Sequence, residues 1–106
     1  MANKPQDEEW TTVAEARSRI VFDTIGDVWE GYYEGPETVH DDVKNEDYEY
    51  LDFRDQAGDG FMASASYQLS RAFTDIPVGT YVRMTVLGFT ETRNGRMTNF
   101  KVQARR

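Results

Sequence analysis

The stretch that decides the fold runs from residue 76 to residue 103 and reads Ile76-Pro-Val-Gly-Thr-Tyr-Val-Arg-Met-Thr-Val-Leu-Gly-Phe-Thr-Glu-Thr-Arg-Asn-Gly-Arg-Met-Thr-Asn-Phe-Lys-Val-Gln103. On both sides of Asn94-Gly95, residues of an apolar face alternate with polar ones, which is the period of a half-buried strand. The Asn-Gly dipeptide tolerates positive φ at both positions of a tight turn. The stretch therefore predicts a β-hairpin. Its polar face and tip carry Arg83, Arg93, Arg96, Asn99 and Lys101.

The bulk composition indicates one folded domain. The chain has 106 residues, of which 39% are hydrophobic and 13% aromatic, so it can bury its own core. It contains no cysteine, which excludes a disulfide scaffold and a thiolate metal site. No long apolar run and no secretory leader pattern occurs, so we expect a cytoplasmic protein that does not cross a membrane.

The charge is unevenly distributed along the chain. The net charge of −7 alone argues against a partner that is itself an anion. Residues 1–60, however, hold 17 acids and 5 bases, whereas residues 61–106 hold 2 acids and 7 bases. The second part is therefore basic, and such asymmetry points to an electrostatic partner without naming it.

Upstream of the hairpin, Tyr67–Phe73 is the best helix candidate, because Ser66 can cap it and Leu69 and Phe73 lie four residues apart. Strands are expected over residues 18–35, 46–54 and 61–66. Residues 36–45 and 55–60 are expected to be a loop and a turn. Within 18–35, one strand bent at Gly26 competes with a hairpin around residues 25–27. We favour the bent strand, because a small barrel needs one strand that serves both sheets.

This order of elements predicts a mainly β fold, a five-stranded OB-fold barrel with one short helix between strands 3 and 4. We expect residues 18–106 to form this domain and residues 1–17 to form a partly disordered N-terminal arm, with Trp10 pinning the arm to the barrel. The residues assigned to the core are Phe22, Leu51, Phe53, Val82, Phe100 and Val102.

Part of the chain resembles a known family. The residues concerned are Val78-Gly-Thr-Tyr-Val-Arg-Met-Thr85, Leu87-Gly88, Asn94-Gly95-Arg96 and Asn99-Phe-Lys-Val102. This pattern is similar to that of small phage-encoded single-stranded DNA-binding proteins of the OB-fold type. The resemblance covers residues 66–103, and residues 20–65 agree only in strand order. It implies non-catalytic binding of single-stranded DNA in phage replication or recombination, in the cytoplasm of the host cell.

Binding of single-stranded DNA needs cations for the phosphates and aromatic faces for the bases. Tyr48 and Tyr50 lie on the outward face of the strand over 46–54 and are the main stacking candidates. Trp29 or Tyr33 is a supporting candidate. Of Trp29, Tyr32 and Tyr33, at least one is expected in the core. The phosphate-binding candidates are Arg54, Arg83, Arg93, Arg96 and Lys101. Acids on the same strand would repel phosphates, so the groove either lies mainly on the hairpin side or takes another ligand.

Nothing in the sequence predicts an enzyme, a cofactor or a metal site. His40 has no second His or Cys at ligand spacing, and the neighbouring acids Asp41 and Asp42 are typical of a solvated loop. The alternative to DNA binding is an acidic OB-fold module that inhibits or recruits a host nucleic-acid-processing protein, such as a replication or transcription protein. A homodimer is a further alternative, because an exposed edge strand can pair with the same strand of a second copy.

Overall fold

The computed structural model describes residues 17–105. The prediction for Trp10, and that for the N-terminal arm except for its last residue Arg17, lie outside these residues. The described chain forms six strands and one helix. They are β1 (Ser18–Arg19), β2 (Val28–Asp41), β3 (Glu46–Arg54), β4 (Gly60–Ser64), α1 (Tyr67–Phe73), β5 (Tyr81–Thr92) and β6 (Gly95–Ala104). No helix in this part of the chain is long and apolar enough to cross a membrane.

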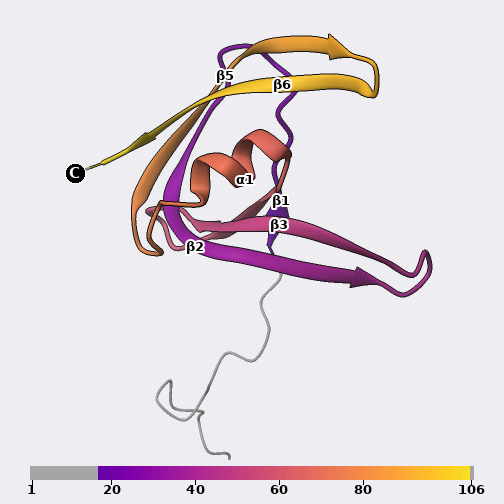
Figure 1. Ribbon diagram of the computed structural model, residues 1–106. Helices are drawn as coiled ribbons and strands as arrows, with labels where there is room; N and C mark the ends of the chain where they lie inside the picture. The colour runs from indigo at the N-terminus through magenta and orange to yellow at the C-terminus, as the bar shows by residue number, and fades with distance from the viewer. Residues whose placement is uncertain (1–16, 106) are drawn as a thin grey trace, which may run out of the picture.

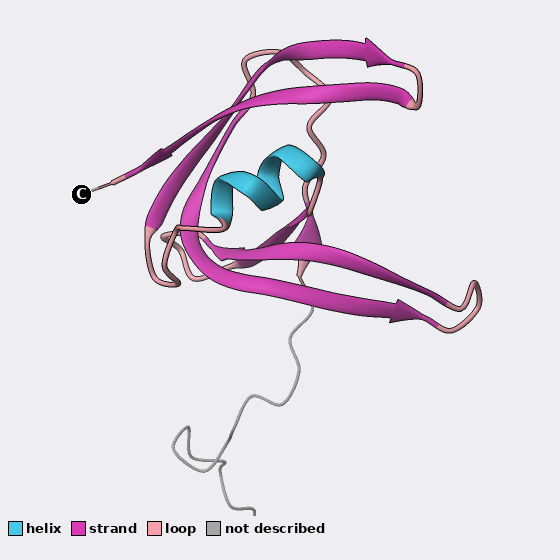
Figure 2. Ribbon diagram, viewed as in Figure 1, coloured by secondary structure: helices cyan, strands magenta, loops and turns pink. Residues whose placement is uncertain are grey.

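All six strands belong to one curled, half-barrel sheet with the order β1-β4-β3-β2-β5-β6 (Figure 1). Neighbours are antiparallel except β1 and β4, which run parallel. The helix α1 lies within the curl (Figure 2). A mainly β fold with one short helix is therefore confirmed, but the predicted number of strands is wrong. Because β1 adds a strand at the start, the helix follows the fourth strand rather than the third.

The helix forms where its cap and its apolar spacing predict it. The Ser66 hydroxyl accepts a hydrogen bond from the Leu69 amide at 3.3 Å, which satisfies one of the free amides of the first turn. Leu69 and Phe73 are both buried, so α1 packs one face into the sheet. Strand β3 likewise has the predicted bounds, with Leu51 and Phe53 on its buried face.

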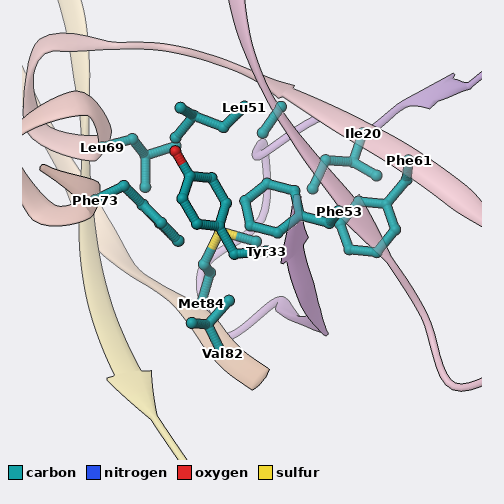
Figure 3. Close-up of a cluster of buried hydrophobic side chains, with 10 residues drawn as sticks. Ile20, Tyr33, Leu51, Phe53, Phe61, Leu69, Phe73, Val82 and Met84 are labelled. Atoms are coloured by element: carbon teal, nitrogen blue, oxygen red, sulfur yellow. The ribbon is translucent and has the colours of Figure 1, made fainter. Parts of the chain in front are cut away.

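The core is a cluster of aromatic and aliphatic side chains between α1 and the sheet (Figure 3). Phe53 is fully buried at its centre, with its ring 5.1 Å from Phe61, 5.4 Å from Phe73 and 5.7 Å from Tyr33. The core predictions for Leu51, Phe53 and Val82 are confirmed. Three others are half-buried and pack against the cluster: Phe22, Phe100 and Val102.

The bent strand expected over residues 18–35 is wrong, and so is the competing hairpin. Residues 20–27 leave the sheet in a turn, and the flanking strands pair with different partners: β1 with β4, β2 with β3 and β5. Gly26 has a φ of +92°, which favours glycine, and its amide donates to the Val86 carbonyl at 2.8 Å. The turn is thereby tied to β5, and the strand is broken rather than bent.

The loop expected over residues 36–45 is also shorter than predicted, because β2 continues to Asp41. A bulge between Tyr33 and Gly35 shifts the register of β2 against β3, and β2 continues beyond it to the β2–β3 turn. At the bulge, Gly35 adopts a φ of +107°. Pro36 is tolerated because β5 pairs only with Val28–Tyr32, so β2 beyond that point is an edge on this side.

The C-terminal hairpin is confirmed in extent, and Val82, Met84 and Val86 are buried as their alternation predicts. The position of its turn is wrong by one residue. Thr92 pairs with Gly95, so the turn consists of residues 93 and 94. Gly95, with a φ of +121°, is the only residue of the turn region with positive φ, and Asn94 is not in that conformation.

Candidate nucleic-acid interface

Two hairpins, β2–β3 and β5–β6, project from the same side of the sheet (Figure 1). A cavity of about 930 Å³ lies along the end of the β2–β3 hairpin, and one of about 460 Å³ lies beside the β5–β6 hairpin. Both cavities are lined by Arg19, Ser64 and Ser66, which lie on β1, on β4 and before α1. The two cavities therefore adjoin at these residues, and we call the pair of them the groove.

Aromatic rings line the groove on both sides of its midpoint. Tyr48 and Tyr50 project from the face of β3 opposite to the buried Leu51, and both line the larger cavity. The Tyr48 hydroxyl donates to Glu46 Oε2 at 2.7 Å, and this hydrogen bond raises the pKa of Tyr48. Tyr67, at the start of α1, lines the smaller cavity with 74% of its surface exposed. Tyr48 and Tyr50 are half-buried and Tyr67 is exposed, so each ring leaves part of its surface accessible for stacking.

Three cations line the same groove: Arg19 at the middle, Lys44 at the β2–β3 turn and Arg96 near the β5–β6 turn. Within residues 17–105, no carboxylate forms an ion pair with any of them. The Arg96 guanidinium stacks 4.0 Å from the centroid of the Phe89 ring, which holds it in place while leaving its donors open. Arg93, in the turn itself, is exposed and equally unpaired among these residues.

The predicted phosphate ligands Arg54 and Arg83 already neutralise carboxylates of the sheet. Arg54 Nε lies 3.0 Å from Glu34 Oε2, and Arg54 Nη1 donates to the Gly58 carbonyl at 2.6 Å. Arg83 Nε lies 2.8 Å from Glu30 Oε2. Hydrogen bonds from Tyr81 and then Arg83 lower the pKa of Glu30. Neither arginine lines the groove.

Three further predicted residues also lie outside the groove. The prediction of Tyr33 as a stacking residue is wrong, because it is 4% exposed and packs against Phe53 and Phe73 in the core. Trp29 is half-buried with its ring 6.0 Å from that of Phe61. Lys101 lies on β6, where it pairs with Thr85 of β5 and is exposed. Of the candidates from the sequence, the groove brings together Tyr48, Tyr50 and Arg96.

Carboxylates gather at the β2–β3 end of the groove, where Asp41, Asp42 and Glu49 line the larger cavity. The single histidine, His40, is bound there rather than free: its Nδ1 lies 2.6 Å from Asp47 Oδ1 and its Nε2 lies 3.4 Å from Asp42 Oδ1. The field at this end repels anions, so the middle of the groove and its β5–β6 end are the parts whose charge favours an anionic ligand.

A further acid on β3, Asp52, lies on the outward face beside Glu37 and Arg17. Burial, together with hydrogen bonding to Glu37, raises its pKa to about 6. Its buried Oδ1 atom accepts no hydrogen bond from any residue between 17 and 105. Burial is the larger cause of the raised pKa; a proton on this carboxyl also allows it to donate a hydrogen bond to Glu37, which raises the pKa further.

Sequence reasoning missed Arg19, Lys44 and Tyr67. For Tyr67 a signal existed: it lies two positions before Leu69, so the helical period that buries Leu69 turns Tyr67 away from the core. For Arg19 none existed, because its place depends on the parallel pairing of β1 with β4 at the far side of the sheet.

No protein-family model matches the chain, and comparisons with curated proteins and with solved structures find no match. The groove is therefore interpreted from its own geometry and chemistry.

Proposed function

We propose that the protein binds single-stranded DNA without catalysis, in the groove between the two hairpins. One observation carries the proposal: the groove brings the guanidinium groups of Arg19 and Arg96, which have no carboxylate partner among residues 17–105, together with the half-buried ring of Tyr50 and the exposed ring of Tyr67. Cations that follow a backbone and aromatic faces that take bases are the two parts that single-strand binding requires.

The fold supports the same proposal. With β1 set aside, the remaining elements follow the order strand, strand, strand, helix, strand, strand of an OB-fold. OB-folds bind oligonucleotides on the face of their second and third strands, between the loop that follows the first strand and the loop that precedes the last. In this chain those features correspond to β3, β4 and the turns of the two hairpins, which border the groove.

The chemistry favours single strands over duplexes. Stacking on Tyr48, Tyr50 and Tyr67 needs bases that are splayed out of a helix, and this is available in a single strand at little cost. Neutralising three phosphates by the groove cations gives a slope of log K against log salt of about −2 for a single strand. We therefore expect moderate affinity with clear salt dependence, in the setting of phage replication or recombination that the resemblance implies.

Fluorescence anisotropy of a labelled oligo-dT, titrated with protein at low and at physiological salt, tests the proposal. We expect saturable binding that weakens as salt increases, and weaker binding of a duplex of equal length. The absence of binding at low salt, or equal affinity for the duplex, would contradict it.

A second candidate is the acidic interaction module that binds a basic host protein. It is favoured by the carboxylates of residues 37–49, most of which are exposed; the Asp42 side chain, for example, is 96% exposed. The same titration separates the two, because this candidate predicts no affinity for DNA. Capture of a basic host protein on immobilised protein, lost when residues such as Asp42 are reversed in charge, would support it.

A further inference from the structure

The two projecting hairpins carry opposite charge. We define the acidic hairpin as residues 37–49 and the basic hairpin as residues 87–101. The acidic hairpin holds six carboxylates and one lysine, a net charge of −5 with His40 neutral. The basic hairpin holds three cations and one carboxylate, a net charge of +2. The two lie at opposite ends of the groove, and Figure 1 shows their tips well separated.

These opposite charges do not meet within one molecule. In the part of the chain that the structure describes, no ion pair joins the two hairpins. The side chains of Asp42 and Asp47 are 96% and 66% exposed, and Arg93 and Arg96 are exposed as well. Each hairpin therefore presents a field that only another molecule can neutralise.

Both hairpins also present unpaired strand edges. Residues 37–41 of β2 pair with β3 alone, and β6 is the last strand of the sheet. Such edges offer free amides and carbonyls to another chain. The opposite charges of the two hairpins and the unpaired edges of β2 and β6 thus both favour contact with another chain.

We propose that the acidic hairpin of one copy docks on the basic hairpin of a second copy, head to tail. The occupant is a second copy because the complementary surface lies on the same chain. A contact of this type leaves one hairpin of each sign free at the two ends, so further copies can add in a row. On a bound strand, each neighbour would neutralise the acidic end of the groove; this consequence rests on the proposed DNA binding, whereas the contact itself does not.

Sedimentation velocity of the full chain without DNA tests the contact. At about 20 mM salt, where screening is weak, we expect the mean mass to rise with protein concentration above the monomer mass of 12.2 kDa. At about 500 mM salt the chain should return to a monomer, because exposed charges are then screened. A monomer at all concentrations in low salt, or a mass that does not respond to salt, would overturn the proposal.

Charge reversal identifies the surfaces. One variant carries Arg93→Glu and Arg96→Glu, and the other carries Asp42→Lys and Glu49→Lys. All four side chains are exposed; Asp42 loses its contact with His40 and Arg96 its stacking on Phe89, and neither contact lies in the core, so both variants should fold, as a circular dichroism spectrum checks. We expect neither variant to associate alone, and an equimolar mixture to regain association.

The mixture is the decisive arm, because both variants keep a net negative charge and general attraction between them is not expected. If each variant associates as the natural chain does, or if the mixture stays monomeric while the natural chain associates, the proposal is overturned. Because no DNA is present, this result is independent of whether the groove binds an oligonucleotide.

Discussion

The basic side chains of this protein divide into those already paired with a carboxylate and those that are not. Arg83 is bound to Glu30, whereas Arg19 lies in the groove without an acidic partner in the described chain. An arginine that must first give up a carboxylate gains little from a phosphate, since one ion pair replaces another. The pairing state, rather than the count of cations, therefore decides which arginines are available to an anionic ligand.

This distinction predicts different outcomes for two matched substitutions. Arg19→Gln should lower the affinity for oligo-dT and reduce the salt slope by about 0.7, the share of one phosphate contact. Arg83→Gln should leave the affinity and the slope unchanged. Titrations at several salt concentrations measure both. Equal losses for the two variants would contradict the assignment of Arg19 to the groove.

Stacking makes a separate prediction at Tyr50. Tyr50→Ala should weaken oligo-dT binding by about 1–3 kcal/mol, the contribution of one stacked base, while Tyr50→Phe keeps the ring and should bind almost normally. Tyr32→Ala is the control, because Tyr32 is 40% exposed but packs edge-on against Tyr81, outside the groove. Anisotropy titrations compare the three. A loss with Tyr32→Ala as large as that with Tyr50→Ala would sink the assignment.

Asp52 predicts a dependence of stability on pH. Its pKa of about 6 lies above the ordinary 3.8, so the folded state holds this proton more tightly than the unfolded state. The resulting stabilisation is present below the ordinary pKa and is lost as the pH rises through about 6. Asp52→Asn is neutral and can donate to Glu37 at every pH.

We therefore expect Asp52→Asn to raise the free energy of unfolding by about 2–3 kcal/mol at pH 7 and by less than about 1 kcal/mol at pH 4. Urea unfolding at the two pH values measures this. A variant that is less stable than the natural chain at pH 7 would show that the Asp52 charge, through Arg17, is a net stabilising group.

At the scale of single elements, the sheet depends on close approach at Gly31 in β2. A Cβ atom there would lie 2.9 Å from the Arg54 carbonyl oxygen and 3.0 Å from the Phe61 ring. Gly31→Ala should therefore lower the free energy of unfolding by about 1–3 kcal/mol, as overpacking does. Gly88→Ala, where the structure leaves open space in β5, is the control and should be nearly neutral. Thermal unfolding followed by circular dichroism compares them, and equal stability of the two variants would contradict the packing described here.

Elements with a complete local signal were predicted well, and those that depend on distant pairing were not. The cap at Ser66 and the four-residue spacing of Leu69 and Phe73 define α1 without help from the rest of the chain. The break at Gly26 could not be predicted, because it depends on hydrogen bonds to Val86 sixty residues later. The hairpin turn lies one residue earlier than predicted, because Thr92 pairs with Gly95 across it and the alternation of the two strands does not by itself determine their exact register.

The same division applies to the candidate site. Tyr48 and Tyr50 followed from strand alternation alone, because the burial of Leu51 and Phe53 directs their neighbours outward. The ion pairs of Arg54 and Arg83 could not be predicted in this way, because a sequence does not show which acids lie across the sheet from them.

At the scale of the whole molecule, the charge asymmetry of the sequence becomes a spatial one. The acid-rich first part of the chain supplies the β2–β3 hairpin and the basic second part supplies the β5–β6 hairpin, with the groove between them. A net charge of −7 is therefore compatible with an anionic ligand, since the ligand meets a local field rather than the mean. The local charge along the groove changes from negative at its β2–β3 end to positive at its β5–β6 end.

The most direct test of the groove is a map of backbone amide shifts by NMR spectroscopy, with an oligo-dT of about 10 nucleotides added to the isotopically labelled chain. We predict that the largest shifts fall on the residues that line the groove, among them Arg19, Tyr50, Ser64, Tyr67 and Met97. The amides of Glu30, Tyr81 and Arg83, which lie together elsewhere on the sheet, should move little. Shifts concentrated on that second surface, or no shifts at low salt, would contradict the account.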